Sequence, residues 1–410
     1  MKKTSQLFLI LLSACVLAWF LPWIAQFAFP SASSSALVSY SPLCNRFIVS
    51  ESDKEHGQTI YEIERQGKQG KKLSKTERDS LLPQIYYTVL SGKDLLPDSV
   101  CGKAISPKIL KENSWVFMMN PRDVNKVAAD VSLIMESMPA RLELEDPTVV
   151  FRMTSDGMEF VDMATNQVLE KRSNRFTNMM KESGFAFPAI AMNANITARK
   201  PYDEGYLMVD SEHQLFHVKM QVGRPYVRRV SSADSVCVEK VFVTENPDRR
   251  FLGIVTDDKH QAYMLESSTY ILHKLPFKWN PEKERMLIMA NLFNWVASVK
   301  RADNTDYYAI DNQTLSLLDS YRVENKPTGY ERAASYIFPF SLSLTSSNDQ
   351  YVYPRIAFNG WQFIWLHAVL ALIALWHWRG SRRKAIIVGC ATLIGGIYVF
   401  IPCLLFINSK

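Results

Sequence analysis

The chain has 410 residues, of which 47% are hydrophobic and 21% are charged, and its formal net charge is +6 at pH 7. This composition is that of a folded protein and excludes a chain that is mainly disordered. Six positive charges lie beside apolar stretches near the two ends, so the remainder is close to neutral and we expect no nucleic-acid partner.

The chain begins with Lys2 and Lys3, followed by an uncharged stretch of 23 residues, 7–29. A transmembrane helix needs about 20 such residues, whereas the apolar core of a signal peptide has about 7–15. The stretch therefore predicts a retained membrane anchor, in which Cys15 is a thiol within the helix and not the lipidated start of a cleaved lipoprotein. Cleavage near residues 31–36, which are rich in serine, is the main alternative.

Residues 31–360 repeat a pattern of short apolar runs that end in polar turns. Such runs are typical of strands, because Asp and Ser side chains bond the backbone where strands reverse. The expected strand pairs are 47–53 with 59–64, 151–157 with 158–162, 206–211 with 214–219, 251–257 with 261–266, and 295–303 with 306–311. A third strand over 315–318 follows the last pair.

The five pairs begin at residues 47, 151, 206, 251 and 295, so the later repeats are close to 45 residues long. Several short strands in repeats of about 45 residues favour a mainly β fold, a β-propeller-like domain of about five or six units. We expect the stretches 336–344 and 351–358 to complete the first unit and close the ring, which would bring the first and second membrane helices side by side. An irregular pair of β-sandwiches is the alternative.

The long interval between the first two strand pairs leaves room for another unit or an insertion. A helix over 74–90 is expected there, because Ser74 and Glu77 resemble a capping box. Apolar residues then recur on one side of that helix, at Leu81, Leu82, Ile85, Tyr86 and Leu90.

Three cysteines lie in the same region, at Cys44, Cys101 and Cys237. Three cysteines allow one disulfide and one unpaired thiol. A bridge between Cys44 and Cys101 and a set of buried free thiols both remain open.

Two further apolar stretches end the chain, and the short loop between them carries four positive charges. Each stretch is long enough to cross a membrane, and short basic loops stay in the cytoplasm. The expected segments are the N-terminal tip and first helix 1–30, the outer domain 31–360, the second helix 361–378, the basic loop 379–384, the third helix 385–407 and an outer tail 408–410. The N-terminus is then cytoplasmic, and both the large domain and the C-terminus lie outside.

Two sets of residues in these stretches have expected roles. Four tryptophans fit aromatic belts at the membrane surfaces, namely Trp361, Trp365, Trp376 and Trp378. Small residues share one face of the third helix, namely Ala385, Gly389, Thr392 and Gly396. We expect this face to pack on the second helix, with contact to the helix of a partner as the alternative.

A search for catalytic motifs finds no glycine-rich phosphate loop, Cys-x-x-Cys, His-Glu-x-x-His or Gly-x-Ser-x-Gly. His213 and His217 are four apart but fall on a turn and a strand, where this spacing does not bring them together. The acidic turns 202–204 and 257–260 are expected to be solvated. His367 is a weak candidate, because ionisable groups within membranes are often functional. We assign no catalytic, cofactor-binding or metal-binding residue.

Three stretches, 41–50, 82–87 and 132–152, are more distinctive than their surroundings. They resemble an uncharacterised family of Bacteroidota membrane proteins, a domain of unknown function, and the resemblance extends over nearly the whole chain. It supplies no site residue. It implies a location in the bacterial inner membrane with a periplasmic domain, and a partner, since members are often encoded beside components of an ABC transporter.

These observations lead to the hypothesis of a membrane-anchored, non-catalytic binding or scaffold protein of the cell envelope, an accessory to an ABC-type transporter subunit. The alternative is a periplasmic enzyme acting on glycan or peptide, with Asp156, Asp257 and Asp303 gathered at one rim. The sequence pairs none of these acids with a base, a nucleophile or a metal, so binding is favoured over catalysis.

Overall fold

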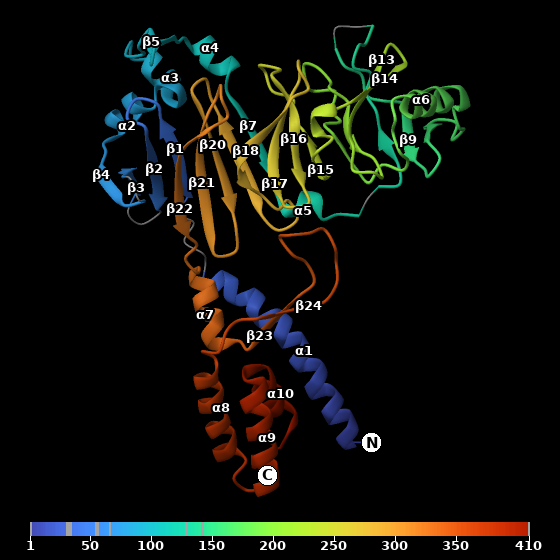
Figure 1. Cartoon of the computed structure of the whole chain (residues 1–410). Coiled ribbons are helices and arrows are strands. Elements are labelled where there is room, and N and C mark those ends of the chain that lie inside the picture. Colours follow the sequence, from blue (N-terminus) through green and yellow to red (C-terminus); the bar gives the residue numbers. More distant parts are fainter. Residues whose placement is uncertain are drawn as a thin grey trace. The chain divides into compact units, whose positions relative to one another are not determined.

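The computed structural model describes residues 2–29, 35–53, 57–64, 67–127, 129–140 and 143–408. It divides into two compact units, coloured along the sequence in Figure 1. The helical unit comprises Met1–Ser35, Glu51–Gln58 and Asn325–Lys410, and the β unit comprises Ala36–Ser50 and Thr59–Glu324. The alternative cleavage region 31–36 lies mostly outside the described residues, as do the last two residues of the expected tail.

Within the described residues the β unit contains five antiparallel sheets of three to five strands. The first holds β1 (Ser35–Ser41), β2 (Arg46–Asp53), β3 (Gly57–Ile63) and β4 (Gln69–Lys72). The second holds β8 (Ser132–Leu133), β9 (Val149–Met153) and β10 (Met158–Asp162). The third holds β11 (Ala191–Ala194), β12 (Tyr206–Val209), β13 (Leu215–Gln221) and β14 (Arg224–Arg229).

The remaining strands of the β unit follow the same up-and-down order. The fourth sheet holds β15 (Val238–Val243), β16 (Phe251–Asp257), β17 (Gln261–Glu266) and β18 (Leu272–Lys278). The fifth holds β19 (Arg285–Ala290), β20 (Asn294–Lys300), β21 (Asn304–Asp311) and β22 (Leu317–Glu324), with β7 (Trp115–Met119) added beside β19. A small hairpin is formed by β5 (Ser99–Val100) and β6 (Lys103–Ala104).

Hydrophobic clusters show which sheets are neighbours. Phe47 of the first sheet and Val296 of the fifth share one cluster, and Trp295 of the fifth and Phe251 of the fourth share another. The fourth sheet packs on the third, and the third on the second, in two further clusters. The sheets thus form a row of first, fifth, fourth, third and second. No cluster among the described residues joins the second sheet to the first, so the row is not closed into a ring.

The predicted strand pairs are confirmed, since each overlaps an observed strand and the fourth pair matches β16 and β17 residue for residue. The expected closure of the ring is wrong. The C-terminal strands β23 (Phe340–Ser343) and β24 (Arg355–Phe358) pair with each other, and the first part of the expected stretch 336–344 is helical. Phe338 stacks on Tyr398 of the helical unit and Phe340 meets the same ring edge to face, so this segment buries its apolar side chains there and not against the first sheet.

Short helices connect the sheets, namely α2 (Lys75–Leu81), α3 (Pro83–Ser91), α4 (Pro107–Glu112), α5 (Pro121–Val124), α6 (Glu170–Glu182) and the 3-10 turn η1 (Ser231–Ala233). The expected helix over 74–90 is present as α2 and α3. Its capping box, formed by Ser74 and Glu77, is confirmed. The division falls before Pro83, because a proline ring disfavours helical backbone in the residue that precedes it.

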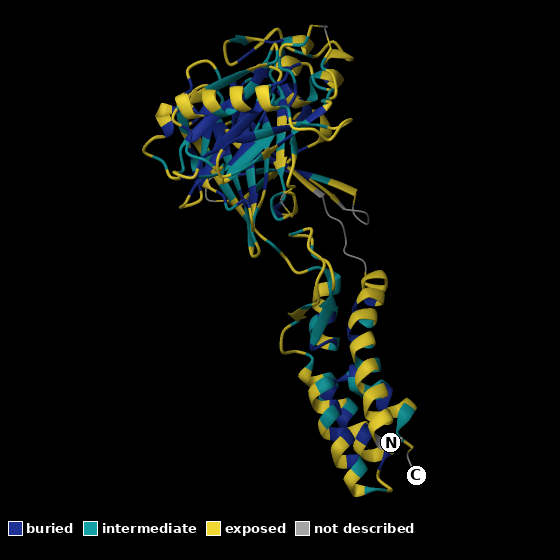
Figure 2. Cartoon of the chain, turned by 90° about the vertical axis from the view of Figure 1, so that its right-hand side faces the viewer, coloured by how far each residue is buried: buried dark blue, intermediate teal, exposed yellow. Residues whose placement is uncertain are grey.

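The helical unit contains α1 (Lys2–Ala28), α7 (Gly329–Ile337), α8 (Ile364–His377), α9 (Arg382–Gly395) and α10 (Ile397–Phe406). Among the described residues only α1, over Thr4–Ala28, is long and apolar enough to cross a membrane. The 14 residues of α8 rise about 21 Å at 1.5 Å per residue, less than the hydrocarbon core of about 30 Å. Large apolar side chains of these helices are nevertheless exposed. Figure 2 colours many residues of this unit as exposed.

The expected third membrane helix is wrong, because Gly396 divides it into α9 and α10, which fold back on each other. Gly396 has φ +55°, a conformation that glycine adopts without steric cost. The indole nitrogen of Trp378 donates to the carbonyl of Ile407 over 3.3 Å, and Lys384 Nζ donates to the carbonyl of Asn408 over 3.3 Å. The described chain thus ends beside the basic loop, and not at the opposite end of the helices.

The packing of α1 also differs from the expectation, because α1 lies mainly against α10 and β23 and not beside α8.

The prediction that the small-residue face of the third stretch packs on the second stretch is confirmed. Gly389 of α9 packs on α8, where an added Cβ would lie 3.0 Å from the Leu375 side chain. Of the four tryptophans expected at membrane surfaces, only Trp378 is fully buried.

The buried face of β16 offers a test of the sheet packing. Ile254→Ala should lower the free energy of unfolding by about 2–5 kcal/mol, because Ile254 is fully buried and its removal leaves a cavity. Ile271→Ala, at a side chain that is 48% exposed, should change it by less than about 0.5 kcal/mol. Thermal unfolding of the purified full-length chain measures both. Equal effects would contradict the assignment of the core.

Candidate functional site

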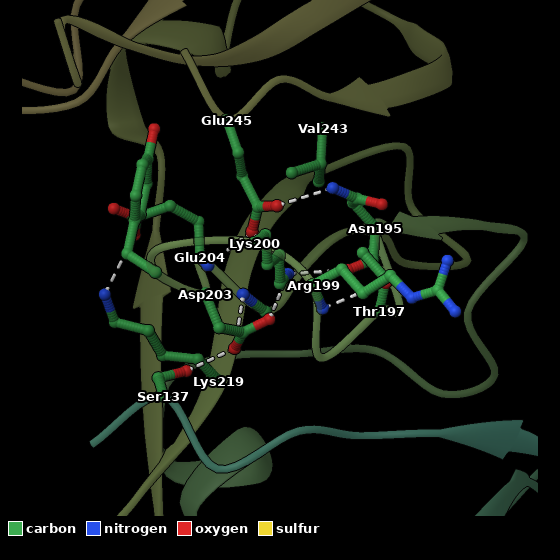
Figure 3. Close-up of polar contacts among 12 residues, drawn as sticks. Ser137, Asn195, Thr197, Arg199, Lys200, Asp203, Glu204, Lys219, Val243 and Glu245 are labelled. Atoms are coloured by element: carbon green, nitrogen blue, oxygen red, sulfur yellow. Dashed lines mark hydrogen bonds and ion pairs between the residues drawn. The ribbon is translucent and has the colours of Figure 1, made fainter. Parts of the chain in front are cut away.

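A buried polar network around Lys200 joins the β11–β12 connection of the third sheet to the β15–β16 connection of the fourth (Figure 3). Lys200 Nζ donates to Asp203 over 2.6 Å, to Glu245 over 2.6 Å and to the carbonyl of Asn195 over 2.5 Å. The side chains of Lys200 and Glu245 are only 6% and 2% exposed. An ammonium group has three N–H donors, so Lys200 is fully satisfied.

Asp203 extends the network toward the second sheet. Its Oδ2 accepts a hydrogen bond of 2.5 Å from the hydroxyl of Ser137 and one of 3.0 Å from the backbone N–H of Gly205. Gly205 has φ +65°, and a Cβ there would lie 2.5 Å from Lys219, so only glycine suits this approach. The expectation of a solvated turn over 202–204 is therefore wrong, because its central carboxylate is needed inside to neutralise Lys200.

The electrostatics of the network are those of a buried ion cluster. Burial raises the pKa of Glu245, and the hydrogen bonds from Lys200 and the Glu204 backbone offset this only in part. Removing one partner of such a cluster typically costs about 3–5 kcal/mol, because the other charge stays buried and unpaired. Its charged groups are engaged with one another, so we interpret the network as a structural brace.

The brace holds the loop 244–250, which connects β15 to β16. Besides the ion pair to Glu245, the Tyr202 hydroxyl donates to the carbonyl of Asn246 over 2.6 Å. The guanidinium of Arg249 lies 4.1 Å from the centre of the Tyr202 ring, a cation–π contact. The segment that contains Lys200 therefore holds both the backbone of this loop and the side chain of Arg249.

The loop 244–250 forms one wall of a cavity of about 710 Å³. The cavity lies where several turns between successive strands meet. Residues from three of these connections line it with polar groups, namely Lys103, Asp248, Arg249, Arg250, Asn312 and Gln313. A cavity of this volume is in the range that holds a small-molecule ligand.

Three cations give this cavity a positive character. Arg250 donates to the carbonyls of Asn312 and Gln313 over 2.5 Å and 2.9 Å, and Lys103 Nζ donates to a backbone carbonyl over 3.3 Å. Arg249 stacks on a tyrosine as described above. In the described parts of the chain none of the three forms an ion pair within 4 Å. Cations that are fixed by neutral groups keep their charge available for an anionic ligand.

His217 lies in β13 beside the brace, and it does not share a site with His213. Its Nδ1 is 2.6 Å from the Tyr270 hydroxyl and its Nε2 is 2.6 Å from the carbonyl of Glu204, so Nε2 carries the proton and donates. Burial, followed by the nearby charge of Lys219, lowers the pKa of His217 to about 4. His213 lies on the preceding turn, with Nδ1 3.0 Å from the carbonyl of Val238.

The three acids of the enzyme alternative lie on turns of three different sheets. Asp156 and Asp303 are exposed, whereas Asp257 is 7% exposed. The carboxylate of Asp257 accepts the backbone N–H groups of Lys259 and Gln261, so it closes its own turn. The turn 257–260 is thus solvated except for this carboxylate. In the residues that the structure describes, no group of three or more potential metal ligands occurs.

His367 has a packing role at the α9–α10 turn. It is fully buried, its Nδ1 lies 3.0 Å from the carbonyl of Leu393, and a side chain at Gly396 would collide with its ring. Cys44, Cys101 and Cys237 are free thiols, so the disulfide left open by the sequence is not present. The alternative of buried thiols is also wrong, because Cys101 and Cys237 are exposed.

The comparison with protein families places these features in a family. The family described as "Domain of unknown function (DUF4857)" matches residues 37–310. The chain belongs to this family. The brace and the three cations of the basic cavity lie within the matched residues, whereas Asn312 and Gln313 of the cavity lie just beyond them.

No curated protein matches the chain. Among solved structures, the β-propeller domain of Cps50 (Swd1) from Myceliophteria thermophila is similar at 10% identity, with 56% of this chain and 72% of that chain covered and a TM-score of 0.26. The Dos1 propeller is similar at 10% identity, with 73% and 63% covered and a TM-score of 0.28. Likenesses at these TM-scores carry no argument about function.

Sequence reasoning missed the residues that matter most here, Lys103, Lys200, Arg249 and Arg250. The adjacent pair Arg249 and Arg250 at a turn between two strands was the available signal. Nothing in the sequence indicates that the distant Lys103 faces that pair, because the approach depends on how the sheets pack.

The low pKa of the buried His217 predicts that the protein loses stability in acid. The folded-state pKa of His217 is about 4, below the ordinary value of 6.5, so between these values the unfolded chain binds a proton that the folded chain does not. Stability should therefore fall as the pH falls from 6.5 to 4, by about 3 kcal/mol from this residue. Unfolding of the full-length chain should lose that part of its pH dependence in His217→Gln.

His213→Asn is the control, because the adjacent histidine lies on a turn and asparagine tolerates its positive φ of 62°. This variant should keep the pH profile of the natural chain. A His217→Gln variant with an unchanged slope between pH 6.5 and 4 would contradict the role given to His217.

Proposed function

We propose that the chain is a membrane-anchored, non-catalytic binding protein that holds an anionic group of a small-molecule ligand in its basic cavity. The observation that carries this proposal is the convergence of Lys103, Arg249 and Arg250 on a cavity of about 710 Å³, with no ion pair to any of the three among the described residues. Guanidinium and ammonium groups bind phosphate and carboxylate oxygens with charge-assisted hydrogen bonds.

The brace supports binding in preference to catalysis. It fixes the loop that carries Arg249 and Arg250 before a ligand arrives, which lowers the entropic cost of binding. Catalysis would need a nucleophile, a base or a metal beside the cations. The Ser267 hydroxyl in the cavity lining donates to the carbonyl of Arg249, and the Asp248 carboxylate accepts the backbone N–H of Arg250, so these two groups are not paired as nucleophile and base.

Membrane attachment is the second part of the proposal. The length and apolar surface of α1 support a membrane anchor, and the basic loop 379–384 supports a cytoplasmic position for that end of the helices. Because the chain returns to this end after Gly396, we place both termini in the cytoplasm. The pair α9 and α10 then enters the membrane and returns, which is tolerated where the turn is buried in protein. The β unit lies outside, in the periplasm of a bacterial cell.

A partner in the membrane remains a hypothesis from the family resemblance. An ABC-type transporter subunit would be such a partner. The small-residue face of α9 no longer supports a contact of this kind, because Gly389 already packs on Leu375.

The basic cavity predicts a charge-dependent affinity. The double variant Lys103→Gln with Arg249→Gln should bind glucose 6-phosphate or citrate at least about tenfold more weakly than the natural chain, because each lost charged hydrogen bond is typically worth about 1.5–3 kcal/mol. Uncharged glucose should bind neither protein. Calorimetric titration of the full-length chain measures these affinities.

The matched control removes two exposed cations elsewhere, Lys259→Gln with Lys300→Gln. It should retain the affinity of the natural chain at the same ionic strength. An equal loss in both double variants would show that only net charge matters, and an absence of binding by every anion tested would refute the proposal.

The return of α10 to the basic loop predicts on which side of the membrane the C-terminus lies. A reporter that is active only outside the cytoplasm should be inactive after Lys410 and also inactive when fused at Ser381, because both positions belong to the same end of the helices. A fusion truncated at Asn325 retains α1 alone and should be active. Activity after Lys410 together with inactivity at Ser381 would show that α10 ends on the outer side.

A further inference from the structure

The hairpin of β23 and β24 carries an apolar face that the helices of its own unit cover only in part (Figure 1). The strand register places Phe340 opposite Phe358, so the two rings share a face. Leu342 and Ile356 form the next pair on that face. Phe340 and Leu342 are half-buried against α1 and Tyr398. On the other strand, Phe358 is 83% and Ile356 is 62% exposed, so the face continues beyond its helical cover.

The run of exposed apolar residues extends from the hairpin in both directions along the chain. In the loop between β23 and β24, Val352 is 73% exposed and lies between two exposed tyrosines. After β24, Trp361 and Trp365 are exposed and lead into α8, where Val369 and Leu372 are also exposed. An apolar surface of this extent marks a contact with a membrane or with a protein.

The few charges of this segment neutralise each other. Residues 338–365 contain one acidic and one basic side chain, Asp349 and Arg355. Arg355 donates to both carboxylate oxygens of Asp349, over 2.6 Å and 2.7 Å. A bidentate pair is less costly to move away from water than two separate charges. Tyrosine and tryptophan, which recur in this segment, are enriched where lipid headgroups meet the hydrocarbon.

The packing on α1 fixes the level of the hairpin in a membrane. β23 lies against the part of α1 that contains Ala18 and Ala25. With Thr4 at the cytoplasmic end, a rise of 1.5 Å per residue places Ala25 about 32 Å away, close to the hydrocarbon thickness of about 30 Å. The hairpin therefore lies at the outer boundary of the hydrocarbon, where water and headgroups can satisfy the open edges of its strands.

We propose that the hairpin β23–β24 and its loop lie in the outer headgroup region of the membrane, with Val352, Ile356 and Phe358 in contact with lipid. This contact rests on the membrane attachment proposed above and adds to it a second attachment, made by strands. The continuity of the apolar face with α1 and the lack of net charge favour lipid over a protein partner. Because interfacial aromatic anchors set the tilt of membrane helices, the hairpin then sets the tilt of the helical unit.

The test places nitroxide labels on single cysteines of the full-length chain in lipid nanodiscs, with the six native cysteines replaced by alanine. Val352→Cys and Phe358→Cys carry the label on the hairpin. Leu12→Cys, at an exposed position of α1, is the lipid reference. Val222→Cys, at a valine of the β unit that is 72% exposed, is the matched water reference. Oxygen concentrates in lipid and a neutral nickel complex stays in water, so the ratio of their collision rates with the label measures depth.

Both hairpin labels should lose nickel contact relative to Val222→Cys and give a ratio between those of the two references. Each variant should keep the unfolding temperature of the cysteine-free chain, and either hairpin position is sufficient if the other fails to fold. A ratio equal to that of Val222→Cys, with Leu12→Cys in lipid, would overturn the hairpin contact alone. Hairpin labels shielded from both reagents would also overturn it, and would assign the face to the β unit or to a protein partner. A water-exposed Leu12→Cys would overturn the membrane attachment and the hairpin contact together.

Discussion

The face-to-face packing of the sheets is the interaction on which the β unit depends. Each sheet has three to five short strands, which are marginal alone and become stable when a face is buried against a neighbour. The fourth and fifth sheets meet around Trp295, whose ring contacts both Phe251 and Trp115 at centroid distances of about 5 Å. This packing brings the turns of separate sheets together, and the basic cavity lies where those turns meet.

Burying Lys200 imposes a second constraint. A lysine inside a protein has to find anionic or carbonyl partners, because an unpaired charge there is very costly. Here Asp203 and Glu245 come from segments next to different sheets, so satisfying one ammonium group also fixes the distance between those sheets. The loop that carries Arg249 is held as a consequence. The network and the cavity are therefore one arrangement, in which a buried ion cluster positions exposed cations.

The helical unit also depends on one local packing requirement, at the turn between α9 and α10. Gly396 lets the chain reverse between α9 and α10, and the ring of His367 fills the space that any side chain at this position would need. The last described residues then come back to Trp378 and Lys384. A single residue without a Cβ thus decides whether the last apolar stretch is one crossing helix or a hairpin that returns.

The sequence by itself determined the strands, the capped helix at Ser74 and the apolar N-terminal helix, because alternation, turn residues and apolar length are local properties of the chain. It did not determine that the row of sheets stays open, that Asp203 is buried, or that Lys103 lies near Arg249. Those depend on which apolar faces meet and on where a buried charge finds its partners, and both are set by contacts between residues far apart in the chain.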